Sequence, residues 1–184
     1  MTVATGLKLL LEAFAELRIP VAIGGSVASS ARGMPRFTAD IDLVASMAGS
    51  RAEAFVTQLG PDWYADAETI QDAIRRGRSF NVIYIPQSYK FDIFPAATEF
   101  HHTQLERATL VPLTLEGSTV SCPVTSAEDI LLAKLSWLQQ GGGSERQRHD
   151  IEGIINANRG LDRVYLESWA RRLGIAELLK TFLQ

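Results

Sequence analysis

Apolar residues recur along this chain with two different spacings. Near the N-terminus they stand three or four positions apart, which predicts a helix over about residues 5–18 that ends before Pro20. After Pro20, short apolar runs separated by glycine, proline or polar turns predict strands with helices between them. From Ser126 onward the apolar residues follow the helical spacing alone. The pattern therefore predicts an α/β module over residues 1–124, followed by a helical module over residues 125–184.

The apolar runs and their boundaries give a set of expected elements. Strands are expected at about residues 21–23, 41–44, 80–85, 91–94, 113–115 and 120–122. Further helices are expected at about residues 26–32, 51–59, 66–76, 126–140, 145–157, 162–173 and 176–183. The third and fourth strands, like the last two, are separated by a short polar turn that is typical of a hairpin. Ser126 followed by Asp129 resembles a capping box, which predicts the start of the helix that opens the second module.

Composition narrows the class of protein. The chain has 184 residues, of which 46% are hydrophobic and 21% charged, so it can bury a core without disulfides. Its single cysteine, Cys122, excludes an internal disulfide and a cysteine-rich zinc site, and we expect it to be a packed structural thiol. The net charge of −3 argues against a broadly basic protein that coats nucleic acid, although a local basic patch is compatible with it.

The sequence also predicts where the protein works. No apolar stretch reaches the roughly 20 residues that span a bilayer. Lys8, Glu12 and Glu16 interrupt the leucine-rich N-terminal run, where a signal peptide would have an unbroken apolar segment. We therefore expect no membrane partner and a cytoplasmic location.

Three aspartates carry the candidate chemistry. Asp40 and Asp42 are one residue apart in an apolar run, and residues i and i+2 of a strand face the same side roughly 6.6 Å apart. Asp92 lies in a second apolar run. Alternating acids alone also fit a solvated strand face, but a third acid favours a site for hard divalent cations, which prefer oxygen ligands. Asp92 is then a metal ligand or the general base.

A glycine turn precedes the acids. Gly24 and Gly25 follow an apolar strand and would let the backbone approach a phosphate, with Ser26 at the start of the next helix. The alternative is that Gly-Gly-Ser is only a turn with a helix cap. The order of turn and acids together favours a site for nucleotide and metal.

These signals share the order seen in a known superfamily. Gly24-Gly25-Ser26, then thirteen residues, then Asp40-Ile41-Asp42, then Asp92 between apolar neighbours, resembles the signature of the DNA polymerase β-type nucleotidyltransferases. The resemblance covers about residues 21–94. It implies a mixed sheet flanked by helices, and Mg²⁺-dependent transfer of a nucleoside monophosphate from an NTP such as ATP to an acceptor hydroxyl. Asp40 and Asp42 would hold two Mg²⁺ ions, with Mn²⁺ as an alternative, and Asp92 would complete the metal site and help activate the hydroxyl. Ser26 would contact the triphosphate.

The helical half resembles a narrower group. The run from Ser126 to Lys134, followed by Arg148-His149-Asp150, is similar to the abortive-infection (AbiEii-like) nucleotidyltransferase toxins. The resemblance implies that Lys134 and Asp150 join the catalytic site, and that Lys134 neutralises triphosphate charge. The alternatives are a surface lysine on an amphipathic helix, and an Asp150 that pairs with Arg146 four residues earlier.

Three functions follow from these patterns. The first is a nucleotidyltransferase toxin that acts on tRNA or protein and has an antitoxin partner. The second is a nucleotidyltransferase for a small molecule, and the third is a non-catalytic member of the fold that binds nucleotide or a partner protein. The presence of all three acids counts against the third.

Several basic residues are weaker candidates. Arg32 and Arg36 flank the loop before Asp40 and could meet phosphate. Residues 75–78 include three arginines that fit either an acceptor-binding patch or a solvated helix end. His101 and its neighbour His102 lack metal-ligand spacing with other histidines or with the cysteine, so a surface role is expected.

Overall fold

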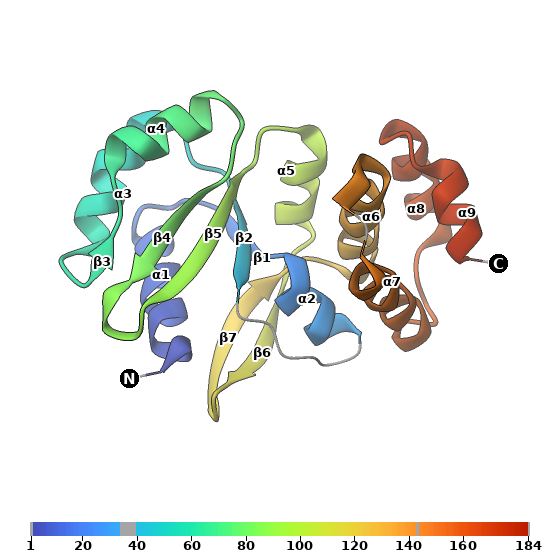
Figure 1. Cartoon of the computed structure of the whole chain (residues 1–184), viewed down its shortest axis with the longest axis horizontal. Coiled ribbons are helices and arrows are strands. Elements are labelled where there is room, and N and C mark those ends of the chain that lie inside the picture. Colours follow the sequence, from blue (N-terminus) through green and yellow to red (C-terminus); the bar gives the residue numbers. More distant parts are fainter. Residues whose placement is uncertain (1, 34–39, 143, 184) are drawn as a thin grey trace.

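The chain folds into a mixed sheet with helices packed around it and a group of helices at one end (Figure 1). This computed structural model describes residues 2–33, 40–142 and 144–183. The helices are α1 (Val3–Glu16), α2 (Gly25–Arg32), α3 (Ala52–Leu59), α4 (Ala67–Arg75), α5 (Glu99–Glu106), α6 (Ala127–Trp137), α7 (Glu145–Ala157), α8 (Arg163–Arg172) and α9 (Ala176–Phe182). The strands are β1 (Val21–Ile23), β2 (Ile41–Ala45), β3 (Trp63–Tyr64), β4 (Phe80–Tyr84), β5 (Tyr89–Pro95), β6 (Thr109–Leu115) and β7 (Ser118–Val124). Short helical turns occupy Gly49–Arg51 (η1), Ile85–Gln87 (η2) and Leu138–Gly142 (η3).

The sheet mixes parallel and antiparallel neighbours. Within the described ranges it has seven strands in the order β3-β4-β5-β2-β1-β7-β6. β2 pairs with β5, and β1 with β7, in parallel; the other neighbouring strands are antiparallel. Both predicted hairpins, β4–β5 and β6–β7, are present. The predicted mixed α/β architecture is therefore confirmed.

One face of the sheet forms the core. In β2, Ile41 and Leu43 are buried on this face, while Asp42 between them points to the other. Helix α1 lies so close to the core face that a Cβ at Gly6 would come within 2.8 Å of the Tyr84 ring. This alternation leaves the Asp42 face of β2 available for chemistry.

The helical end packs directly onto the α/β part. The ring of Phe100 in α5 lies 5.2 Å from that of Trp169 in α8. Arg107, which follows α5, places its Nε 3.4 Å from the carboxylate of Asp129, whose side chain is fully buried. One cluster of buried apolar residues includes members of both parts. The predicted division at residues 124 and 125 marks a change from sheet to helices, and its status as a domain boundary stays a prediction.

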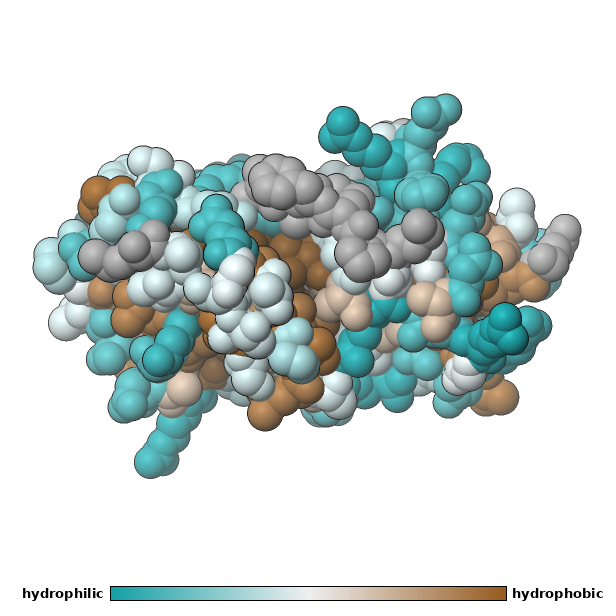
Figure 2. Space-filling model, turned by 90° about the horizontal axis from the view of Figure 1, so that it is seen from below, coloured by the Kyte–Doolittle hydropathy of each residue, from teal (hydrophilic) through white to brown (hydrophobic). Residues whose placement is uncertain are grey.

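The surface seen in Figure 2, from the side on which the β6–β7 hairpin projects, is mostly hydrophilic, with apolar residues gathered near its centre. Among the described residues, no helix combines the length and apolar character needed to cross a bilayer.

Two elements lie outside the predicted set. Helix α5 has a weak apolar pattern, because Phe100 and the polar Gln104 are its buried residues. Thr98 is its N-cap residue, and the Thr98 side chain accepts a hydrogen bond from the backbone N–H of His101. β3 has two residues, of which Trp63 is buried and Tyr64 exposed. This strand is too short for an alternation of apolar and polar residues to be recognised in the sequence.

Candidate active site

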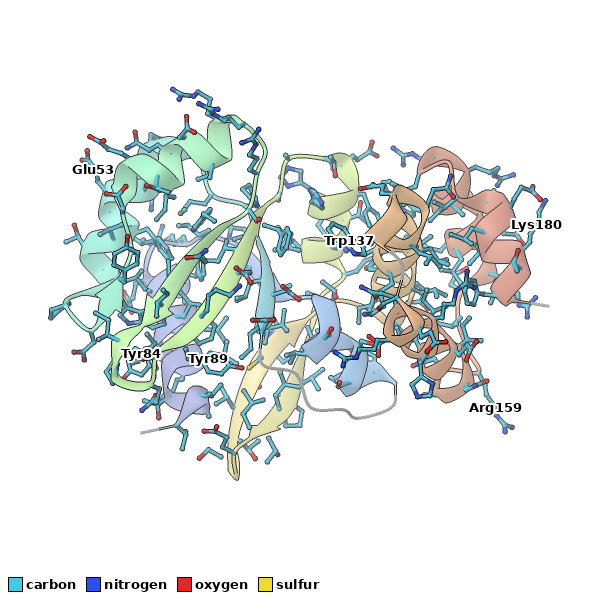
Figure 3. The ribbon with its side chains drawn as sticks, in the orientation of Figure 1. Glu53, Tyr84, Tyr89, Trp137, Arg159 and Lys180 are labelled. Atoms are coloured by element: carbon cyan, nitrogen blue, oxygen red, sulfur yellow. The ribbon has the colours of Figure 1, made fainter. Side chains whose placement is uncertain are left out.

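Asp42 and Asp92 lie side by side in the sheet. β2 and β5 are parallel neighbours in a register that pairs these two residues, so their side chains leave the sheet on the same face about 5 Å apart at the backbone. Asp40 directly precedes β2 and lies level with Lys90 in this register. In Figure 3, Tyr89 marks the start of β5, and the strand runs upward from it. The structure therefore brings together the three acids that the sequence separates by up to 52 positions.

The glycine turn wraps around the carboxylate of Asp42. Gly25 has a positive φ of 55°, and a Cβ on it would lie 1.8 Å from Oδ2 of Asp42. The backbone N–H of Ser26 donates a hydrogen bond to this carboxylate. The N–H of Gly24 donates to the backbone carbonyl of Asp42 at 2.9 Å. The residue at position 25 must be glycine because the metal-ligand candidate occupies the space of a side chain.

The electrostatic environment of Asp42 favours a nearby cation. Burial raises the pKa of Asp42 above the usual aspartate value, and the negative charge of Asp92 raises it further. The hydrogen bond from Ser26 lowers this pKa, the charge of Asp40 raises it, and the ammonium of Lys134 lowers it. Because neighbouring carboxylates oppose the ionisation of Asp42, an added positive charge would stabilise the cluster.

Lys90 supplies one such charge, and sequence reasoning missed it. Its Nζ lies 2.7 Å from Oδ2 of Asp92 and 3.8 Å from Oδ1 of Asp40. The hydrogen bond with Asp92 raises the pKa of Lys90. The signal in the sequence was its position two residues before Asp92, which puts both side chains on one face of the strand.

Lys134 and Asp150 form an ion pair inside the protein. Lys134 Nζ lies 2.8 Å from Oδ2 of Asp150 and 3.0 Å from Oε1 of Gln147, and both charged side chains are buried. The alternative of a surface lysine is therefore wrong. Since Lys134 also lowers the pKa of Asp42, its charge reaches the acidic cluster. Catalytic roles for this pair stay a prediction.

The acidic cluster suits a divalent cation by its chemistry. Carboxylate oxygens are the ligands that Mg²⁺ and Mn²⁺ prefer. Asp40 and Asp92 already form ion pairs with a cation, the ammonium of Lys90. No group of three or more His, Cys, Asp or Glu side chains in residues 2–33, 40–142 and 144–183 is already arranged as a metal site. A metal would therefore be held by the three aspartates only after some of their side chains move.

Arg32 has a structural role instead of a place in the cluster. Its guanidinium donates hydrogen bonds to the backbone carbonyls of Val124 and Thr125, at 3.2 Å each, and to the hydroxyl of Thr109 at 2.6 Å. It thus holds the end of α2 against β6 and β7. Arg36 lies outside the residues that the structure describes.

The other basic candidates are engaged locally. Arg75 and Arg76 both pair with Asp72 on the exposed end of α4, which agrees with a solvated helix end. The imidazole of His101 accepts a hydrogen bond from the backbone N–H of Ala97 at 3.2 Å. Burial lowers the pKa of this histidine.

Comparison with solved structures identifies the class of fold. The solution structure of the antibiotic-resistance factor ANT(2'')-Ia aligns over 97% of this chain and 96% of its own, with 19% sequence identity and a TM-score of 0.50. An antigenic nucleotidyltransferase-like protein from Paracoccidioides brasiliensis aligns over 85% of this chain and 77% of its own, with 21% identity and a TM-score of 0.50. No protein-family model matches the chain, and no curated protein matches it in sequence. The chain has the nucleotidyltransferase fold, as the order of its motifs predicted.

Proposed function

We propose that this protein is an NTP-dependent nucleotidyltransferase. The observation that carries the proposal is the pairing of Asp42 with Asp92 on parallel strands, with Asp40 two residues before Asp42, in a nucleotidyltransferase fold. These are the positions at which the sequence resemblance expects the catalytic acids. Asp40, Asp42 and Asp92 would hold Mg²⁺, or Mn²⁺ in its place.

The reaction joins an acceptor hydroxyl to the α-phosphorus of the NTP. The new bond forms between the acceptor oxygen and this phosphorus, the bond to the bridging oxygen breaks, and pyrophosphate leaves. A bound divalent ion would stabilise the charge that develops on the phosphate oxygens. Asp92 would take the hydroxyl proton, a role supported by its side chain, which lies on the same face of the sheet as Asp42 and is partly exposed.

Lys134 would act as a fixed positive charge beneath the triphosphate. An ammonium has three N–H donors, and the described contacts account for two, to Asp150 and Gln147. The third would be left to donate to a phosphate oxygen while the pair with Asp150 is kept. Asp150 is then a positioning residue that keeps Lys134 in place. Ser26, at the start of α2, is proposed to contact the triphosphate.

A small-molecule acceptor is the better supported of the two acceptor classes. One fold neighbour that aligns over nearly its whole length is an antibiotic-resistance factor. The net charge of −3 also gives little electrostatic attraction for a polyanion such as tRNA. The similarity of the helical half to AbiEii-like toxins supports the alternative, transfer to tRNA or protein by a toxin that has an antitoxin.

Labelled NTPs test this function directly. The protein is incubated with each labelled NTP and Mg²⁺, together with a panel of hydroxyl-bearing antibiotics, total RNA or lysate protein. We expect label on a small molecule, and loss of transfer in Asp40→Asn but not in the matched surface control Glu177→Gln. Transfer that survives in Asp40→Asn would remove the proposed mechanism, and label on RNA or protein would favour the toxin alternative.

A further inference from the structure

One ammonium group touches two of the three acids. Lys90 lies two residues before Asp92 on β5 and level with Asp40 on the neighbouring strand. Its Nζ is 2.7 Å from Asp92 and 3.8 Å from Asp40. The charge of Asp42 also contributes to raising the pKa of Lys90, so all three carboxylates interact electrostatically with this ammonium. Lys90 therefore lies where the three acids attract a cation.

The two lysines of the site differ in their freedom to move. The side chain of Lys134 is 6% exposed, and Asp150 and Gln147 hold it. The side chain of Lys90 is 44% exposed and sits on a flexible four-carbon stem. Because exposed ion pairs contribute little free energy, the ammonium of Lys90 can turn away into solvent at small cost. Lys134 is a fixed cation, and Lys90 is an exchangeable one.

We propose that Lys90 is a built-in competitor for the divalent cation of this site. The inference rests on the proposed function, because it concerns the ion that nucleotidyl transfer needs. An ammonium and a divalent ion on the same carboxylates repel each other strongly at a few ångströms. When the ion binds, Lys90 must release Asp92 and Asp40. The lysine thus keeps the acids in place in the metal-free protein and raises the ion concentration needed to fill the site.

Mn²⁺ binding to the metal-free protein tests this role without any assay of activity. Titration followed by electron paramagnetic resonance or calorimetry should show that Lys90→Met binds Mn²⁺ about fivefold more tightly than the wild type, since one competing charge is lost. Lys90→Arg keeps the charge and should stay close to wild type. The control Lys8→Met removes an equal charge from an exposed pair with Glu12 on α1, and should leave Mn²⁺ binding unchanged.

Thermal unfolding gives a second readout, because the Lys90→Met variant should be less stable than the wild type without metal and should gain more stability when Mn²⁺ is added. In EDTA, Lys90→Met should unfold at a lower temperature than the wild type, because the positive charge of Lys90 no longer offsets the repulsion among the three acids. Added Mn²⁺ should raise the midpoint of this variant more than that of the wild type. A lysine with only a structural role would lower both midpoints alike.

Each outcome decides between the two proposals. If Lys90→Met binds Mn²⁺ as well as or less well than a wild type that does bind it, the competitor role is overturned and the proposed function stands. If neither protein binds Mn²⁺ at millimolar concentration, the metal site fails, and the proposed function fails with it.

Discussion

At the residue scale, the site depends on the space around the carboxylate of Asp42. Gly25 and Ser26 enclose that carboxylate, one by lacking a side chain and the other through its backbone N–H. The sequence indicates a glycine turn but not what the glycine faces. A turn that approaches phosphate and a turn that approaches a metal-binding aspartate have the same sequence, and the tertiary contact distinguishes them.

Gly25→Ala should displace this carboxylate. The new Cβ would lie 1.8 Å from Oδ2 of Asp42, and the φ of 55° adds a cost of about 1–2 kcal/mol for any L-residue. We expect a loss of at least about 2 kcal/mol in the free energy of unfolding, measured in urea, together with loss of Mn²⁺ binding. Gly49→Ala is the control, because its Cβ would make only an ordinary contact of 3.9 Å with Gln71. Equal effects of the two substitutions would contradict this account.

Cys122 should be unreactive in the folded protein. Burial raises the pKa of its thiol to about 11, so little thiolate is present at pH 8. We expect a disulfide reagent to modify it on the order of a hundredfold more slowly in the native state than in urea. The matched variant moves the thiol one position to the exposed Ser121, as Ser121→Cys in a Cys122→Ala background, and should react fast. Because the folded thiol holds its proton more tightly, its contribution to stability should fall as pH rises toward 11.

At the element scale, the sequence predicted most of the secondary structure but not its pairing. The β4–β5 hairpin follows from adjacent apolar runs with a turn between them. The parallel pairing of β2 with β5 is not local, since helices and two other strands lie between them along the chain. This pairing is what puts Asp42 beside Asp92. The acids could therefore be found from sequence, whereas the contact of Lys90 with Asp40 on the neighbouring strand could not.

The buried pair of Lys134 and Asp150 joins α6 to α7. Lys134→Met removes the ammonium that pairs with a buried carboxylate, so it should cost about 3–5 kcal/mol in the free energy of unfolding. The double variant Lys134→Met/Asp150→Leu removes both charges and should recover much of that loss. Lys180→Met, which breaks an exposed pair with Glu177, should change stability within experimental error. A double variant less stable than Lys134→Met would indicate that the charges themselves hold the helices together.

At the scale of the whole molecule, the question is whether the α/β part and the helical part are separate units. Their contacts include the ring pair of Phe100 with Trp169 and the ion pair of Arg107 with Asp129. The hydroxyl of Tyr165 in α8 also donates a hydrogen bond to Asp129. The ammonium of Lys134 in α6 also lowers the pKa of Asp42 in β2, so charges of the two parts interact. These contacts between the two parts favour a molecule that folds as one.

Cooperative unfolding of both parts is therefore the expected result, and the tryptophans can report it. Trp63 lies in β3 and Trp169 in α8, and both are buried, whereas Trp137 is exposed. A variant with Trp137 and Trp169 replaced by Phe reports the sheet, and one with Trp63 and Trp137 replaced reports the helices. In each variant, the fluorescence transition in urea should coincide with the loss of helical circular dichroism. Separate transitions would instead make residues 124 and 125 a true domain boundary, and would mean that the charge of Lys134 can leave the acidic site by local unfolding of the helices alone.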